Sequence, residues 1–410
     1  MKIFTSLIRI FLITFVLSGI AYSQISNNFQ LANRFMQQQE FEKALPIFKK
    51  IVNENPTEYY FFERYIQCYI GLKQYDEALD VFEELNPIKN LGAQAQVLKA
   101  QLFYFKEDTA QAFSIWDKNI ADNPTNLQLY INTANVMSDM KEFDRAVNTL
   151  REARSVFNNQ QLFYSEISNT LLQAGNYESA VQEWISWLTA QPDQISNIQR
   201  LLLRFDDEFL NDITILELED ALQEISVTNP AYNSLFRFQV WLLQENKLYR
   251  RALASAKAFE ESTSNFNYSL FQLGRSLRVN KEYDLAVQAF TYYIEKAQGN
   301  VKWQSQQELA TVYSEWAKQL DDYNVGVHEQ RDSLYRKALT ELNTILGETS
   351  SYRNLNAVLL MKSEIVLDHL HDLNQAAEVL TRLNNISKNN DLPEEFYIQG
   401  RIHIANKKYR

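Results

Sequence analysis

The sequence has little of what disulfide-bonded, metal-binding and nucleotide-binding proteins need. Its one cysteine, Cys68, leaves no partner for an internal disulfide and no second thiolate for a zinc site. Its four histidines, His328, His369, His371 and His403, have no zinc-binding spacing and are expected on the surface. Its nine glycines never occur as G-x-G, which excludes the usual phosphate-cradling loop. We therefore expect no catalytic, cofactor or metal site, and a buried, unreactive Cys68.

Glycine and proline are both scarce, with 9 and 7 residues among 410, whereas Leu, Ala, Glu and Gln are abundant. This composition favours helices over strands. Hydrophobic residues make up 46% of the chain, which is enough to form a buried core. The formal net charge is −11 and no basic block follows the N-terminal segment, so nucleic acid is not expected as a partner. The composition predicts a folded, all-α protein.

The N-terminal segment, residues 1–23, differs from the rest of the chain. Lys2 and Arg9 precede a mainly apolar run over 10–17, and small residues stand one and three places before Gln24. This order is typical of a cleavable secretory signal, and the run is short for a membrane span. We predict export to the periplasm of a Gram-negative bacterium. If residues 1–23 remain uncleaved, the alternative is a membrane-anchored protein that faces the periplasm.

Beyond this segment, the chain is organised by alanines that recur every 34 residues: Ala44, Ala78, Ala112, Ala146 and Ala180, and again Ala252 and Ala286. A large residue follows most of them by four places, as Phe48 follows Ala44. Another small residue precedes several of them in the same unit, as Ala32 precedes Ala44. The apolar positions on either side fall on one face of a helix. Each unit is therefore predicted to be two antiparallel helices that pack closely through small residues, and stacked units share a core.

This pattern resembles the tetratricopeptide repeat, with a length of 34, a small residue at the eighth place, an aromatic at the seventeenth, alanine at the twentieth and an aromatic or leucine at the twenty-fourth. The resemblance implies a right-handed α-solenoid of about ten repeats that binds a protein or peptide in a concave groove. The predicted organisation is a signal peptide, 1–23; five regular repeats, 24–194; a degenerate repeat, 195–232; two regular repeats, 233–300; a repeat with an inserted loop, 301–352; and a divergent repeat with the start of an incomplete one, 353–410.

Two features depart from the regular spacing. The interval from Ala286 to Ala338 is 52 residues, and we assign the 18 extra residues to a loop around 321–333. A long loop in a compact array either carries function or is a tolerated insertion. The chain also stops after what resembles the first helix of a further repeat. We therefore expect a fragment, and the alternative function is the regulatory array of a larger enzyme or a membrane-anchored assembly factor.

The inner face of such an array is the stripe at places 2, 5, 9 and 12 of each first helix, which lines the groove in the family that this chain resembles. The ninth place holds a carboxamide in the first five repeats: Asn33, Gln67, Gln101, Asn135 and Asn169. Because a carboxamide both donates and accepts hydrogen bonds, this column can bind the backbone of an extended peptide. Apolar residues stand on the same stripe: Phe29, Tyr60, Val97, Tyr104 and Ile131. The alternative is an ordinary solvated polar face.

Repeats seven and eight carry different residues on this stripe: Arg237, Trp241, Tyr268, Phe271, Arg275 and Arg278. Arginines beside aromatic residues in an acidic protein can accept the carboxylates of a partner. The alternative is intramolecular pairing with Glu245 or Glu282. The sequence as a whole predicts a non-catalytic, exported scaffold that binds extended segments of a protein or peptide partner, without nucleic acid, metal or cofactor.

Overall fold

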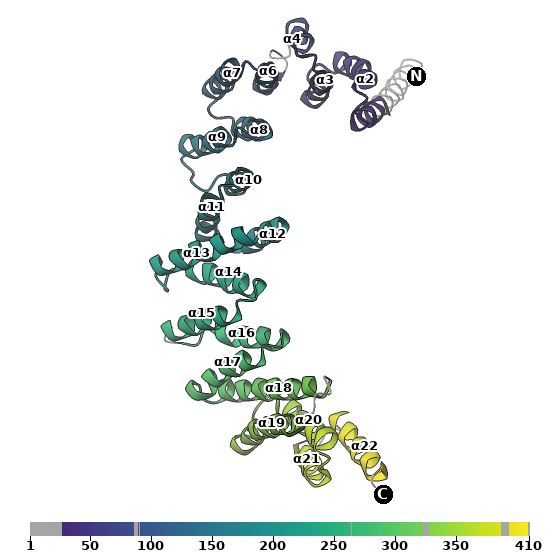
Figure 1. The fold of residues 1–410 in the computed structure, drawn as a ribbon, viewed down its shortest axis with the longest axis vertical. Coiled ribbons are helices and arrows are strands. Elements are labelled where there is room, and N and C mark those ends of the chain that lie inside the picture. The colour runs from purple at the N-terminus through teal and green to yellow at the C-terminus, as the bar shows by residue number, and fades with distance from the viewer. Residues whose placement is uncertain are drawn as a thin grey trace, which may run out of the picture. The chain divides into compact units, whose positions relative to one another are not determined.

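The structure, a computed structural model, describes residues 27–85, 89, 91–263, 265–322, 328–386 and 393–408 (Figure 1). The described residues form helices and the turns between them, and none of them lies in a strand. The chain forms two compact units, residues 1–190 and residues 191–410. The predicted signal peptide, residues 1–23, lies outside the described residues.

The first unit is a series of helices joined by short turns (Figure 1). Residues 27–37 are helical, and the helices that follow are α2 (Phe41–Glu54), α3 (Tyr59–Leu72), α4 (Tyr75–Glu84), α6 (Ala93–Phe105), α7 (Thr109–Asp122), α8 (Leu127–Asp139), α9 (Phe143–Val156), α10 (Tyr164–Gln173) and α11 (Tyr177–Ala190). Helices that are neighbours in the chain pack together, and α6 also contacts both α3 and α8, the first helices of the adjacent repeats. This is the stacking that the 34-residue spacing predicts.

The second unit continues with helices of the same kind (Figure 1). Its elements are the short 3-10 helix η1 (Pro192–Gln194), α12 (Ile195–Phe205), α13 (Glu208–Glu224), α14 (Tyr232–Glu245), α15 (Tyr249–Ser262), α16 (Ser269–Val279), α17 (Tyr283–Lys296), α18 (Asn300–Asp322), α19 (His328–Glu348), α20 (Leu355–Glu364), the π-helical turn η2 (Ile365–His369), α21 (Leu373–Ile386) and α22 (Pro393–Lys408). Here too α15 contacts α17 and α16 contacts α18. First helices therefore stack on first helices, and second helices on second helices.

The regularly spaced alanines form the tightest part of the core. Every one of them is 0% exposed: Ala44, Ala78, Ala112, Ala146, Ala180, Ala252 and Ala286. Gly274 shows why small residues are needed, since a Cβ atom there would lie 3.0 Å from Cβ of Ala289 and 3.0 Å from Cζ of Phe290. Two helices that approach this closely leave no room for a larger side chain. The prediction of an all-α array of stacked helix pairs is confirmed.

A second periodic feature lies at the turn inside each repeat. A residue one or two places after the end of the first helix has a positive φ in seven repeats: Gln39, Lys73, Glu107, Lys141, Gly175, Lys247 and Lys281. At Lys141, backbone N–H groups close the turn, because Lys141 N donates to Ser138 O at 2.9 Å and Glu142 N donates to Met137 O at 2.8 Å. This is the left-handed closure of a helix C-terminus that usually takes glycine. Only Gly175 in this set is glycine, so the other six residues hold a conformation that their own side chains disfavour.

The prediction of a loop over 321–333 was wrong for most of that range. Helix α18 extends to Asp322 and α19 begins at His328, so the extra residues lengthen two helices to 23 and 21 residues. Residues 323–327 lie outside the described residues. Residues 328–333 are nearly all polar, so their sequence carries no apolar stripe. They are helical because they continue α19, whose later turns are anchored by the buried Leu334 and Tyr335.

Candidate protein-binding site

The predicted carboxamide column lies on the first helices of the first unit. Its members occupy the helical segment 27–37 and helices α3, α6, α8 and α10 in order: Asn33, Gln67, Gln101, Asn135 and Asn169. Asn135 is exposed and the other four are half-buried. Asn33, Gln101 and Asn135 make no side-chain hydrogen bond to any described residue. These side chains therefore keep donors and acceptors for a partner, and the peptide-binding role of the column remains a prediction.

Two members of the column are partly engaged. Gln67 Oε1 accepts a hydrogen bond from Arg64 Nη1 at 2.9 Å. Asn169 Nδ2 donates to Ser165 Oγ at 3.4 Å, whereas its Oδ1 is buried and has no partner among the described residues. A buried carbonyl oxygen without a donor is unfavourable. A donor from a bound peptide would satisfy it.

The two tyrosines predicted beside the column have different surroundings. Tyr60 is 47% exposed and its ring packs on that of Phe29 at a centroid distance of 5.3 Å. Tyr104 is half-buried, and its hydroxyl donates to Glu142 Oε1 at 2.9 Å, across to the next repeat. Burial and this carboxylate raise the pKa of Tyr104. Tyr60 is thus available to a partner, whereas Tyr104 serves mainly to join two repeats.

Val97 does not belong to the exposed stripe, although the sequence pattern placed it there. It is 1% exposed, and its carbonyl oxygen accepts a hydrogen bond from Nε1 of the fully buried Trp116 at 3.3 Å. The same correction applies to Phe271 in the second unit, which is 4% exposed and packs edge-on against Phe290. In both repeats, large neighbouring aromatic rings turn the fifth place of the first helix toward the core.

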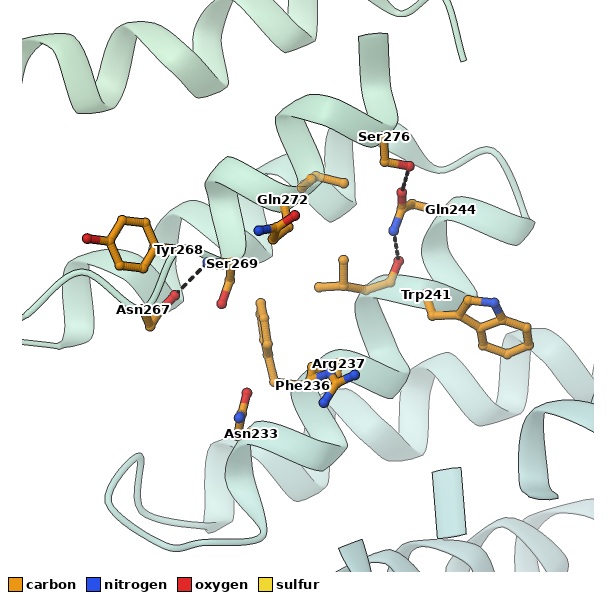
Figure 2. A pocket seen from close by; sticks show the side chains of 12 residues that line it. Asn233, Phe236, Arg237, Trp241, Gln244, Asn267, Tyr268, Ser269, Gln272 and Ser276 are labelled. Carbon is orange, nitrogen blue, oxygen red and sulfur yellow. Dashed lines mark hydrogen bonds between the residues drawn. The ribbon is translucent and has the colours of Figure 1, made fainter. Parts of the chain in front are cut away.

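The second unit contains a pocket of about 350 Å³ between the first helices α14 and α16 (Figure 2). Its lining comes from α14, from α16 and from the turn before α16: Asn233, Phe236, Arg237, Val240, Trp241, Gln244, Asn267, Tyr268, Ser269, Gln272, Leu273 and Ser276. The predicted residues Arg237 and Trp241 belong to it. The volume is at the lower end of the range for ligand pockets. Arg237 is the one charged residue in this lining, and no carboxylate lines the pocket.

A buried carboxylate on the preceding helix fixes the edge of the pocket. Glu260 is 2% exposed, and its Oε1 accepts hydrogen bonds from the backbone N–H groups of Asn267 at 2.9 Å and Tyr268 at 3.2 Å. Tyr268 has a φ of +62°, a left-handed conformation that the two bonds hold in place. Figure 2 shows Asn267 Oδ1 accepting from the backbone N–H of Ser269, at 2.9 Å. Glu260 therefore positions the turn that carries three lining residues.

The lining residues divide into those already hydrogen-bonded and those that are not. Gln244 Nε2 donates to Val240 O at 3.2 Å, and Ser276 Oγ donates to Gln244 Oε1. By contrast, six polar side chains have no hydrogen-bond partner among the described residues: Asn233, Arg237, Trp241, Tyr268, Ser269 and Gln272. In Figure 2 three of these come from α14 and Gln272 comes from α16. The pocket therefore presents unused polar groups from both of its walls.

The other two predicted arginines already have partners. Arg275 Nε donates to Glu308 Oε1 at 2.7 Å, and Arg278 Nη1 donates to Glu315 Oε1. Both carboxylates belong to α18, so the ion pairs join the first helices of successive repeats. Intramolecular pairing was the alternative reading, but its expected partners, Glu245 and Glu282, were wrong. Of the three arginines, only Arg237 is exposed and without a partner among the described residues.

The described residues contain no candidate metal centre. No group of histidine, cysteine, aspartate and glutamate side chains among them is arranged to hold a metal ion. Cys68 is 0% exposed, so the prediction of a buried cysteine is confirmed, and burial raises the pKa of its thiol to about 12, which favours the unreactive thiol form. His369 was expected on the surface but is half-buried, with its ring stacked on Tyr335 at 4.2 Å. Burial lowers the pKa of His369, and the positive charge of nearby Lys318 lowers it further.

In the described part of the chain, no helix has both the length and the apolar character needed to cross a membrane.

Comparison with known proteins gives one family match. The model of the tetratricopeptide repeat matches residues 35–102. No curated protein matches the chain. Among solved structures, the Naa15/Naa10 complex bound to HypK-THB aligns at 12% identity with a TM-score of 0.27, over 94% of this chain and 66% of that chain, just under two thirds of its length.

Two bacterial tetratricopeptide-repeat structures also align. The C-terminal part of a protein from Cytophaga hutchinsonii has 12% identity and a TM-score of 0.28, over 65% of this chain and 94% of that chain. A protein from Parabacteroides merdae has 12% identity and a TM-score of 0.26, over 77% and 98%. These scores are too low to compare overall arrangements or sites. The family match identifies tetratricopeptide repeats within residues 35–102, and the buried alanines from Ala112 to Ala286 mark further helix pairs of the same kind.

Proposed function

We propose that this chain is a non-catalytic scaffold that holds an extended segment of a protein partner along its first helices and anchors it in the α14–α16 pocket. Stacked tetratricopeptide repeats imply protein–protein interaction, because they present a long continuous surface. One observation carries the finer proposal: the pocket of about 350 Å³ opens between two first helices and has six polar side chains without hydrogen-bond partners among the described residues. Polar groups that are available to a ligand, around an apolar floor, favour a ligand that brings both kinds of contact.

The anchoring pocket can be tested with a peptide library. Random dodecapeptides, displayed through their C-termini, would be selected on the full chain, and enriched sequences would be synthesised with amidated C-termini. Their affinity would then be measured by fluorescence anisotropy on two variants. Gln272→Trp fills the pocket from an exposed position of α16, whereas Val279→Trp adds the same side chain at a 71% exposed position of that helix outside the lining.

We expect Gln272→Trp to weaken binding by about ten-fold or more, equivalent to about 1.4 kcal/mol, and Val279→Trp to leave it unchanged. If the selection enriches no peptide, or if both variants bind the enriched peptides as the parent does, the proposal of an anchoring pocket is wrong.

We also propose a separate binding surface in the first unit, the carboxamide column. A peptide backbone that exchanges N–H and C=O hydrogen bonds with the column would bind without strong sequence preference. The test is a variant with all five carboxamides changed to alanine, Asn33, Gln67, Gln101, Asn135 and Asn169, compared with the parent at equal helicity by circular dichroism. A peptide that binds the first unit should bind the variant more weakly. Equal binding would show that the column is only a solvated face.

We also infer that the protein is exported, on the charged, apolar and small-residue order of residues 1–23. N-terminal sequencing of the protein from its own cells tests this inference. A mature chain that begins at Gln24 supports cleavage and a periplasmic scaffold. A chain that begins at Met1 in a membrane fraction supports the membrane-anchored alternative.

A further inference from the structure

The charge of the α14–α16 pocket is unusual for this chain. The protein carries a net charge of −11, yet the pocket lining holds one cation, Arg237, and no anion. Several arginines of the unit are neutralised within the fold, as Arg251 is by Glu219 at 2.6 Å and Arg275 is by Glu308 at 2.6 Å. Arg237 has no such partner among the described residues. Its guanidinium is therefore the group that an anionic ligand would meet in this pocket.

The hydrogen-bonding character of the free groups narrows the ligand further. The guanidinium of Arg237 and the indole N–H of Trp241 can only donate, whereas the side chains of Asn233, Tyr268, Ser269 and Gln272 can both donate and accept. A carboxylate is complementary to the two donor-only groups, because it accepts only and has about four acceptor positions on two oxygens. A lysine side chain has no acceptor to offer them. The donor excess thus favours a carboxylate over lysine, serine or an apolar side chain.

The geometry places these donors around an apolar floor. Phe236, 2% exposed, and Leu273, 2% exposed, lie beneath the opening, and the Trp241 ring stacks on Phe238 at 5.9 Å with an interplanar angle of 11°. Figure 2 shows Arg237 and Trp241 on the α14 wall and Gln272 on the α16 wall. The methylene groups of an acidic side chain would cover the floor while its carboxylate reached the donors. A low-dielectric floor also strengthens a charge-assisted hydrogen bond beside it.

We propose that the α14–α16 pocket selects an aspartate or glutamate side chain of the bound segment, which forms an ion pair with Arg237. This inference rests on the proposed function and specifies which side chain the pocket anchors. An acidic side chain, rather than a chain end, is the occupant because Arg237 stands at one point along an open groove between two helices. The single positive charge matches one carboxylate, whereas phosphate groups are usually held by several arginines.

The test uses the same displayed dodecapeptide library, in which no peptide has a free C-terminal carboxylate. Selections would be run in parallel on the full chain and on two variants, Arg237→Gln and Arg336→Gln. Arg336 is an exposed arginine of α19 without a side-chain partner among the described residues, so both variants change the net charge equally. An enriched peptide and its Glu→Gln or Asp→Asn counterpart would then be titrated into all three proteins.

The expected result is an acidic residue at one fixed position of the enriched peptides, for the parent and Arg336→Gln but not for Arg237→Gln. On the parent, the amide counterpart should bind about ten-fold more weakly, and on Arg237→Gln the two peptides should bind alike.

Three outcomes would overturn the inference in different ways. If Gln272→Trp blocks the binding of the enriched peptides but these share no acidic position, the anchoring pocket is supported and its preference for an acidic side chain is wrong. An acidic preference that is reduced equally by Arg237→Gln and Arg336→Gln would show general charge attraction. A selection that enriches no peptide would remove the proposed function itself.

Discussion

Two ion pairs that join successive repeats, one in each unit, differ in how far they are removed from water. In the first unit, Arg154 of α9 and Glu183 of α11 form a bidentate pair at 3.1 and 2.8 Å, with side chains 9% and 10% exposed. In the second unit, Arg275 of α16 and Glu308 of α18 pair at 2.6 Å, with side chains 40% and 16% exposed. The first pair joins second helices, and the other joins first helices on the predicted inner face.

The comparison shows that burial determines how strongly the stability of a repeat depends on an Arg–Glu pair. Arg154 also donates from Nε to the carbonyl of Leu162 at 2.7 Å and lies over the ring of Tyr164, so every part of its head group is occupied. A buried pair of this kind stabilises little relative to an apolar replacement, but losing one partner leaves an uncompensated charge. The exposed pair contributes little in either case. Burial, rather than the presence of the ion pair, should therefore decide which repeats are sensitive to mutation.

The largest effect is expected at the buried pair. Glu183→Ala leaves the Arg154 guanidinium buried without its carboxylate and should lower the free energy of unfolding by about 3–5 kcal/mol. Urea denaturation followed by circular dichroism measures this loss. The double variant Arg154→Met with Glu183→Leu, which removes both charges, should recover most of it. A single-variant loss below about 1 kcal/mol would contradict the comparison.

The next largest effect tests whether burial acts in the same way in the second unit. Glu260→Ala removes the buried acceptor of the Asn267 and Tyr268 backbone N–H groups, so two donors lose their partner. We expect a loss of about 1–3 kcal/mol in urea denaturation and weaker binding of peptides selected on the α14–α16 pocket. The matched control is Glu261→Ala, since Glu261 is the exposed neighbour of Glu260. Equal effects of the two substitutions would show that Glu260 does not hold the pocket edge.

A smaller effect, of opposite sign, should be equal in the two units. Lys141 and Lys281 occupy the same turn position, with φ of +65° and +64°. Glycine adopts this conformation without the steric penalty of a Cβ atom, so Lys141→Gly and Lys281→Gly should each stabilise the protein by about 0.5–1 kcal/mol. Thermal and urea denaturation check the sign. A destabilised variant would mean that the lysine side chain contributes more than the backbone strain removes.

The smallest effect is expected at the exposed pair. Glu308→Gln should change the free energy of unfolding by less than about 1 kcal/mol, and the change should fade in 0.5 M salt because screening weakens exposed charges. The loss in Glu183→Ala should persist in the same salt. Urea denaturation of both variants at low and high ionic strength compares them directly. Equal salt sensitivity would mean that the two ion pairs are equally solvated.

The sequence predicted those parts of the fold that repeat. The 34-residue spacing identified the buried alanines and the helix pairs, because a core shared between stacked units requires a small residue at the same place in each. Chain-order patterns could not reveal the partners of Arg275 and Arg278, which lie 33 and 37 residues further along the chain, at Glu308 and Glu315. Such pairs depend on the rotation of one helix relative to the next repeat, and the apolar pattern does not determine this rotation.

The site was predicted in part for the same reason. Arg237 and Trp241 were identified by their places on the inner stripe, and both line the pocket. Gln272 lies on the face of α16 toward α14, at a place outside that stripe, so only the packing of two adjacent helices reveals it. Glu260 was not singled out, because glutamate is common on exposed helix faces. Its position on α15 directly after Phe259 and four residues after Ala256, both apolar and buried, was the available signal.

The left-handed turn residues have a consequence for how the chain folds. At six of the seven turns, a residue other than glycine holds a conformation that a short isolated peptide would rarely keep. The packing of neighbouring repeats must therefore hold the turn in its left-handed conformation. In an isolated repeat, the turn between the two helices should become disordered before the helices unfold. Folding within each unit should therefore be cooperative, because each helix pair is fully stable only when the next repeat packs against it.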